Sequence, residues 1–151
     1  PAVAALNEAI ELNPSMAFAH TILGSTFGYG GMPADGLHHL AIATRLSPRD
    51  FAQAGNLSTQ GLCHFIAGRF GEAAELERRA ILLRPHFGTA WRTLAASAGM
   101  SNDLETAAHA LLEARRLHPS LSVEWVEKHH PIVRSEDRAI YIEGLRAAGL
   151  N

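Results

Sequence analysis

The sequence has few of the features that mark secreted, nucleic-acid-binding or membrane-embedded proteins. Its 151 residues include one cysteine, Cys63, which excludes an internal disulfide and fits a reducing compartment. The net charge is −2, so no basic excess is available to neutralise nucleic acid phosphates or anionic lipids. No apolar run approaches the roughly 18–20 residues that would span a bilayer, and no signal peptide opens the chain. We therefore expect a cytoplasmic protein that binds neither nucleic acid nor membrane.

Signatures of catalysis and of metal or cofactor binding are also missing. The sequence has no glycine-rich phosphate loop, no HExxH, no CxxC and no nucleophile elbow. The best metal candidates are the pairs His38-His39 and His129-His130. Adjacent helical residues project about 100° apart, so neither pair can chelate one ion from a single face. Cys63 lies in a helix interior and is expected to pack rather than to react. We predict no enzyme, no cofactor and no metal site in this chain.

What the sequence does contain is a regular ladder of prolines at positions 14, 48, 85 and 119. The intervals are 34, 37 and 34 residues, and the prolines follow similar words: AIELNP, AIATRLSP, AILLRP and LLEARRLHP. A period of this length is typical of proteins built from stacked helix pairs. Because the residue before a proline avoids the α conformation, each proline ends one helix and precedes the next. No segment shows the two-residue alternation of a strand.

The ladder divides the chain into repeats. Counting back from each proline gives full frames at 17–50, 54–87 and 88–121. Residues 1–16 are then the second helix of a truncated repeat, 51–53 an insertion, and 122–151 capping helices that break the period. The chain begins at Pro1 within a helical pattern, so we expect a piece of a longer protein. We predict one domain with helices at about 2–12, 16–29, 33–46, 51–67, 70–83, 87–100, 103–117, 120–129 and 135–148.

Small residues recur at positions 8, 20 and 27 of the frames, where they let two antiparallel helices approach closely. The first and third frames supply Leu23-Gly24, Phe27, Gly36, Leu40, Ala43 and Pro48, and Trp91, Leu94-Ala95, Ala98, Ala107, Leu111, Ala114 and Pro119. This pattern resembles the tetratricopeptide repeat. The resemblance implies an all-α superhelix of antiparallel helix pairs that contacts other proteins. A generic helical bundle would not repeat small residues at the same phases.

The middle repeat carries polar residues at three seam positions, Gln60, His64 and Glu77. Two alternatives are open. The insertion at 51–53 rotates the helix so that apolar residues pack and the polar ones reach solvent, or His64 and Glu77 form a partly buried pair. The second follows because an unpaired buried charge is costly. We expect some pairing of His64 with Glu77.

By the same resemblance, positions 2, 5, 9 and 12 of each first helix line the concave face of the stack. The candidate partner-binding residues there are Phe18, Thr21, Ser25, Ser58, Leu62, Phe65, Thr89 and Arg92. Small side chains leave room for a peptide or helix, and the apolar and arginine side chains offer contacts. Chaperone-binding members hold a C-terminal carboxylate with several basic and amide residues, of which only Arg92 is present here. The alternative is a groove that is solvated or filled by the chain's own tail.

The N-terminal helix at 2–12 has an apolar face without a first-helix partner. Its members are Val3, Leu6, Ile10 and Leu12. An uncovered apolar face favours association, so we predict a homodimer through this helix.

Three sequence segments are more specific than the repeat pattern: SPRDF at 47–51, GLCHFIAGRFGEAAE at 61–75 and YIEGLRAAGL at 141–150. Together they resemble the C-terminal tetratricopeptide regions of bacterial proteins built on a class III adenylate/guanylate cyclase domain. Related regions follow winged-helix DNA-binding domains in transcriptional regulators. The resemblance implies a non-catalytic signalling module whose partner is a protein or peptide, or another domain of the same chain. A self-contained metal-binding protein or enzyme is the remote alternative.

Overall fold

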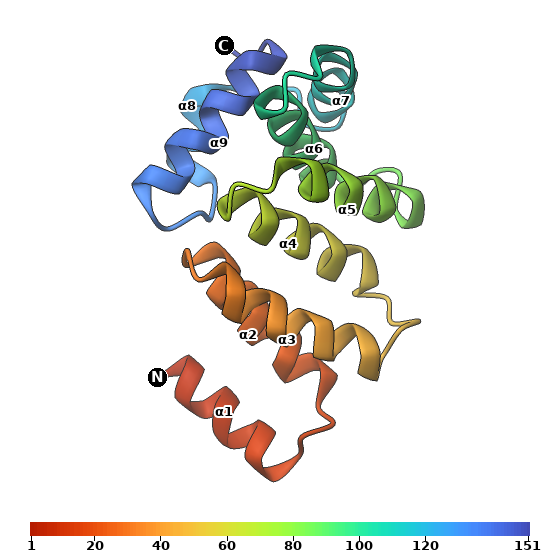
Figure 1. Cartoon of the computed structure of the whole chain (residues 1–151), viewed down its shortest axis with the longest axis vertical. Coiled ribbons are helices and arrows are strands. Elements are labelled where there is room, and N and C mark those ends of the chain that lie inside the picture. Colours follow the sequence, from red (N-terminus) through yellow and green to blue (C-terminus); the bar gives the residue numbers. More distant parts are fainter.

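The computed structural model describes all 151 residues, and its regular structure is entirely helical. Figure 1 shows an elongated stack with the N-terminus at one end and the C-terminus at the other. All predicted helices are confirmed, with bounds within three residues of those expected. They are α1 (Ala2–Leu12), α2 (Ala17–Tyr29), α3 (Pro33–Leu46), α4 (Gln53–Ile66), α5 (Phe70–Leu83), α6 (Gly88–Met100), α7 (Leu104–Leu117), α8 (Val123–His129) and α9 (Ser135–Ala148).

The residues that precede the ladder prolines share one backbone conformation. Asn13, Ser47, Arg84 and His118 all have φ between −143° and −138° and ψ between 69° and 88°. In each case the N–H donates to the carbonyl four residues earlier, and the carbonyl accepts the N–H three residues later. The prolines therefore end each second helix in the same way and direct the chain into the next repeat.

The turn inside each helix pair needs a left-handed residue at one fixed position. Gly31 has φ 82°, Gly68 has φ 81° and Asn102 has φ 58°. These are residue types that tolerate positive φ. Each of these residues lies in the short turn between the two helices of a pair.

Small residues bring the two helices of a pair together, as predicted from the sequence. A Cβ atom added to Gly24 of α2 would approach the Gly36 carbonyl of α3 to 3.1 Å and would clash with Leu40. The alanines at the same late position of α3, α5 and α7, which are Ala43, Ala80 and Ala114, are all buried. The pairs α2–α3, α4–α5 and α6–α7 are accordingly among the most extensively packed in the protein.

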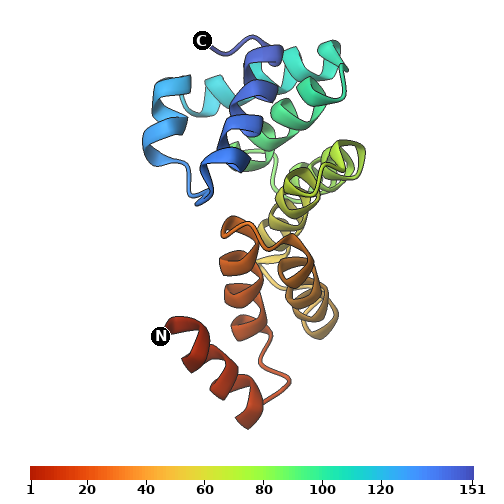
Figure 2. The ribbon, with the colours of Figure 1, turned by 60° about the vertical axis from the view of Figure 1, so that its left-hand side comes forward.

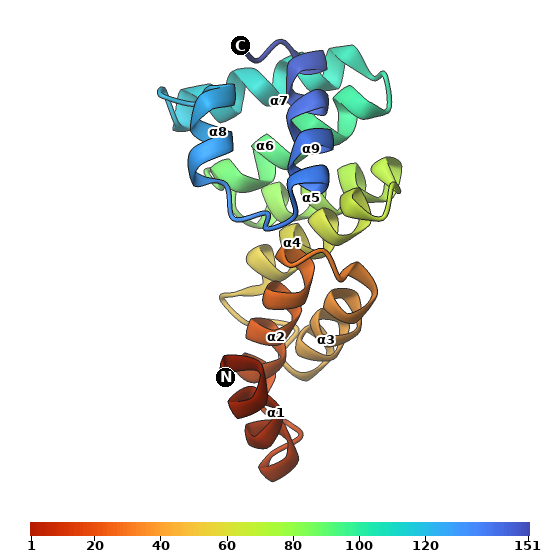
Figure 3. The same cartoon turned by 90° about the vertical axis from the view of Figure 1, so that its left-hand side faces the viewer.

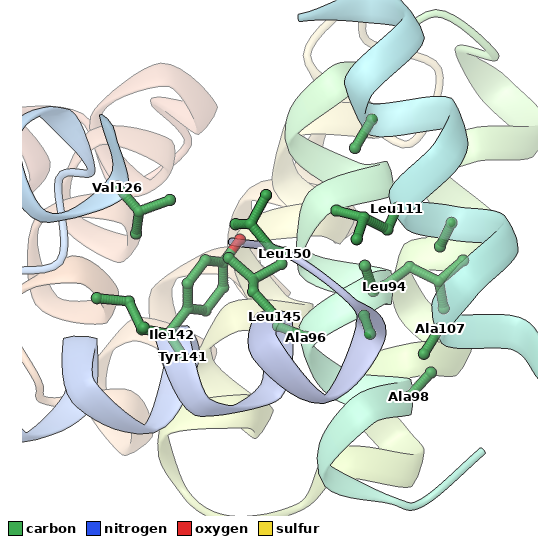
Figure 4. Packing of buried hydrophobic residues seen from close by; sticks show 14 of the residues in the cluster. Leu94, Ala96, Ala98, Ala107, Leu111, Val126, Tyr141, Ile142, Leu145 and Leu150 are labelled. Atoms are coloured by element: carbon green, nitrogen blue, oxygen red, sulfur yellow. The ribbon is translucent and has the colours of Figure 1, made fainter. Parts of the chain in front are cut away.

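The C-terminal helix α9 does not continue the stack in the way that α4 and α6 do. It packs chiefly on α6, the first helix of the last repeat, and much less on α7 (Figures 2 and 3). At their crossing the backbones nearly touch, because a Cβ atom on Gly99 would clash with the Gly144 carbonyl, and one on Gly144 would clash with the Ala96 carbonyl. Around this crossing lies the main core, which includes Leu94, Leu111, Tyr141 and Leu145 (Figure 4).

No helix of the structure is both long enough and apolar enough to cross a membrane.

The close crossing of α6 and α9 generates a stability prediction. Gly144→Ala should lower the free energy of unfolding by about 1–3 kcal/mol, because the added methyl group overpacks a backbone contact. Gly71→Ala is the matched control, since Gly71 is also helical but has nothing within 4 Å of an added Cβ. It should leave stability unchanged or raise it by less than about 1 kcal/mol. Urea denaturation of both variants measures the difference, and equal stabilities would contradict the close packing.

Candidate partner-binding site

One half of the concave face is an open hollow of about 430 Å³. The first helices of all three repeats line it: α2 contributes Thr21 and Ser25, α4 contributes Ser58, and α6 contributes Thr89. The structure thus brings four of the eight predicted residues to one place. Thr21, Ser25 and Thr89 are partly exposed, so their uncharged hydroxyl groups can form hydrogen bonds with a peptide backbone. Ser58 is only 3% exposed.

Residues outside the predicted set complete this hollow. Asn56 of α4 lies among the hydroxyls, although it is only 3% exposed. Phe51, Phe87 and Arg84 also line the hollow, and Phe51 is 90% exposed. The insertion at 51–53 was visible in the sequence, but nothing there indicated that it would place an aromatic ring beside this groove.

Phe18 lies next to the hollow rather than in it. It is exposed and lines a smaller adjoining space of about 100 Å³ together with Thr21, Asp50 and Asn56. Because Thr21 and Asn56 line both spaces, the two form neighbouring parts of one surface.

The other half of the concave face is closed. We expected Leu62, Phe65 and Arg92 to be accessible to a partner, and this is wrong for all three. Phe65 is 1% exposed and packs edge-on against Tyr141 of α9, with ring centroids 5.4 Å apart. Leu62 belongs to the same core, and the Arg92 guanidinium lies 5.4 Å from the Trp125 ring centroid of α8. The chain's own tail fills this part of the groove, which was one of the alternatives drawn from the sequence.

The segment that joins α8 to α9 also reaches the first repeat. The Val133 N–H donates to the Tyr29 carbonyl oxygen at 3.0 Å, and Arg134 Nη1 approaches the Gly31 carbonyl oxygen at 3.5 Å. These contacts tie the C-terminal cap to the end of α2. They mark the boundary between the open and the closed half of the concave face.

Glu77 is fully buried without the predicted histidine partner. It is 0% exposed, and neither carboxylate oxygen has a donor in hydrogen-bonding geometry. Burial raises its pKa well above the usual range, while the nearby Ser58 hydroxyl and Arg92 guanidinium lower it in part. Glu77 occupies the seam position that Leu40 and Leu111 hold in the other repeats. The insertion at 51–53 therefore does not rotate helix α5, and the same repeat position faces the seam in all three repeats.

His64 pairs with a different residue from the one expected. Its Nδ1 accepts a hydrogen bond from Arg69 Nε at 2.8 Å, so the predicted pairing with Glu77 is wrong. Burial and the Arg69 charge lower the pKa of His64. The alternative of solvent-facing polar residues holds in part, because His64 and Gln60 are half-exposed whereas Glu77 is not.

A buried polar cluster surrounds Glu77 and joins the repeats to the tail. Thr93 Oγ1 and the Tyr141 hydroxyl lie 2.9 Å apart, and burial raises the pKa of Tyr141. Burial raises the pKa of Tyr29 to about 12 and, together with the Arg92 charge, lowers the pKa of His130 to about 3. Near neutral pH these groups are uncharged, which limits the cost of enclosing them.

The remaining reactive side chains do not come together in a catalytic or metal-binding site. Burial raises the pKa of Cys63 to about 12, so its thiol is protonated near neutral pH. His20 and His39 lie with their Nδ1 atoms 3.0 Å apart, a pairing between α2 and α3 that the sequence did not indicate. No group of three or more His, Cys, Asp or Glu side chains lies close enough together to hold a metal ion.

The position of Glu77 generates the second prediction. Leucine is the residue at this seam position in the other repeats. Glu77→Leu should therefore raise the free energy of unfolding at pH 8 by about 1–4 kcal/mol. The pKa of Glu77 is higher in the folded state than in the unfolded state, so the folded state binds the proton more tightly. The stability that wild type gains from this proton is fully present below the unfolded pKa near 4.5 and is lost as pH rises. The gain should therefore shrink as pH falls toward 4.5.

Thermal and urea denaturation between pH 4.5 and 8 measure this gain. Glu75→Leu is the matched control on the exposed face of α5 and should change stability by less than about 0.5 kcal/mol. A pH-independent difference between wild type and Glu77→Leu would show that Glu77 is not held protonated.

The fold is similar to that of several solved structures, including those of PilW and MamA. "Crystal structure of PilW, widely conserved type IV pilus biogenesis factor" has a TM-score of 0.73 at 18% identity, over 96% of this chain and 63% of that one. "Crystal structure of MamA" has a TM-score of 0.70 at 18% identity, over 97% of this chain and 84% of that one. The chain thus spans less than two thirds of PilW. Its sequence matches no protein-family model and no curated protein. At this identity the similarity concerns the fold, which is an all-α superhelix of the tetratricopeptide type.

Proposed function

We propose that this chain is a non-catalytic protein–protein interaction module that binds an extended segment of a partner in the open half of its concave face. The observation that supports this most directly is the convergence of Ser25, Ser58 and Thr89 from three successive first helices on one hollow. A surface composed in this way depends on the stack as a whole, and its polar groups can pair with peptide N–H and C=O groups.

The closed half of the face limits the length of the partner segment. Helices α8 and α9 bury Phe65 and Arg92, so a bound segment has to end or turn away near Tyr29 and Ser58. The space available suits a short segment rather than one that runs along all three repeats.

A substitution that fills the hollow tests this proposal. Linear peptides are first selected against the wild-type chain from a random phage-displayed library that attaches them through their carboxyl ends. Ser25→Trp should then weaken binding of the selected peptides about tenfold or more, a loss of about 1.4 kcal/mol, because the indole occupies the space of the ligand. Fluorescence anisotropy with the labelled synthetic peptides measures the affinity.

Thr26→Trp is the matched control, because Thr26 adjoins Ser25 on α2 but is exposed and does not line the hollow. It should leave affinity unchanged, and circular dichroism should show both variants folded. Peptides that bind both variants as tightly as wild type would place the interaction elsewhere on the surface.

The wider setting that we propose is bacterial signalling. In this setting the module regulates a nucleotide cyclase domain in its parent protein, is cytoplasmic, and self-associates through α1. The sequence segments at 47–51, 61–75 and 141–150 support the cyclase setting. The partly exposed Val3, Leu6 and Ile10 and the 82% exposed Leu12 support self-association. An effector region of a winged-helix regulator is the alternative.

The parent protein provides the test of this setting. Cyclic nucleotide production should change when residues 1–151 are deleted from it, and unchanged production would contradict the proposed regulation.

Self-association is tested separately. Equilibrium sedimentation should reveal a dimer that Leu6→Glu converts to monomer. A wild-type chain that is monomeric at high concentration would contradict self-association.

A further inference from the structure

Arg84 is the only charged residue among those that line the open hollow. It lies in the connection between α5 and α6, and its backbone has the conformation shared by all residues before the ladder prolines, with φ −142° and ψ 87°. Its N–H donates to the Ala80 carbonyl, and its carbonyl accepts from the Phe87 N–H. The backbone therefore holds the base of this side chain in a defined place.

Contacts with two aromatic residues hold the guanidinium as well. Its Cζ lies 5.2 Å from the Phe51 ring centroid and 5.0 Å from that of Phe87, which are cation–π distances. Its Nη2 donates to the Phe51 carbonyl oxygen at 3.0 Å. Because Phe51 belongs to the insertion at 51–53, the other repeats lack this arrangement. Their equivalent residues are Asn13, Ser47 and His118, none of which is a permanent cation.

The positive charge of Arg84 is not neutralised within the chain. Arg78, Arg116 and Arg134 all form ion pairs with carboxylates, whereas no carboxylate lies within 4.0 Å of Arg84. Asp50 lines a neighbouring space together with Arg84, but it forms no ion pair with Arg84, and its Oδ1 accepts the Ala52 N–H at 2.7 Å. A guanidinium has five N–H donors, and only one of these is used by the protein.

We propose that the open hollow selects partner segments carrying an aspartate or glutamate side chain, whose carboxylate pairs with Arg84. This inference rests on the proposed function, since it names the kind of segment that the hollow accepts. The partly exposed hydroxyl groups of Thr21, Ser25 and Thr89 bind the backbone of the segment, and the Arg84 guanidinium supplies the charge preference. A preoriented arginine can bind a carboxylate through two parallel hydrogen bonds at a low cost in side-chain entropy.

The peptides selected from the phage-displayed library test this proposal. They should be enriched in Asp or Glu at one position, and Arg84→Gln should weaken their binding about tenfold or more. Changing the enriched acid to its amide in the peptide should cause a similar loss. The two changes together should cost little more than either alone, because both remove the same pair. Arg49→Gln is the control, since this exposed arginine lies in the preceding connection and does not line the hollow.

The outcomes separate this proposal from the proposed function. Peptides that lose affinity with Ser25→Trp but show no acidic preference, or bind Arg84→Gln as tightly as wild type, overturn the role of Arg84 and leave the groove as a docking site. Failure to select any peptide that is sensitive to Ser25→Trp overturns both. Attachment through the carboxyl end removes the free terminal carboxylate, so enrichment has to come from side chains. Binding of synthetic peptides that requires a free C-terminus would assign the Arg84 site to terminal carboxylates and overturn the side-chain assignment.

Discussion

The close crossing of α6 and α9 is the contact on which the arrangement of the C-terminal half depends. Two glycines, Gly99 and Gly144, allow the helix backbones to meet, and a methyl group on either would clash with main-chain atoms. This approach lets Tyr141 and Leu145 enter the core between the repeats. It also places α9 on the concave face, which closes one half of the groove and leaves the other half open.

Enclosing the concave face brings polar groups into the interior. Glu77, Arg92 and Tyr141 come from three different helices, and each has at least one polar atom away from bulk water. Burial is the main cause of the raised pKa values of Glu77 and Tyr141, and it favours the uncharged form of both side chains. The open hollow differs from this cluster, because partly exposed hydroxyl groups line it and Arg84 is its single charged residue.

The helices could be predicted closely from the sequence, because their ends depend on local chemistry. Prolines stop the second helices, and Gly31, Gly68 and Asn102 form the turns within pairs through positive φ angles. Half of the groove residues were also predictable, because the same repeat positions face the groove in each repeat when the period is constant. Glu77 and His64 were assigned to each other incorrectly. The repeat position of Glu77, shared with Leu40 and Leu111, was the signal that could have shown it to be buried in the seam.

The sequence by itself determined the repeat length, the helix bounds and the face of each helix that points inward, because these depend on neighbours within one or two turns of chain. Only the tertiary structure decided where the non-periodic tail packs, and therefore which concave residues stay accessible. It also decided that Phe51 and Phe87, far apart in sequence, meet at the Arg84 guanidinium. These outcomes depend on contacts between distant segments that no local pattern encodes, since side-chain shape and close backbone approach select them only in the assembled stack.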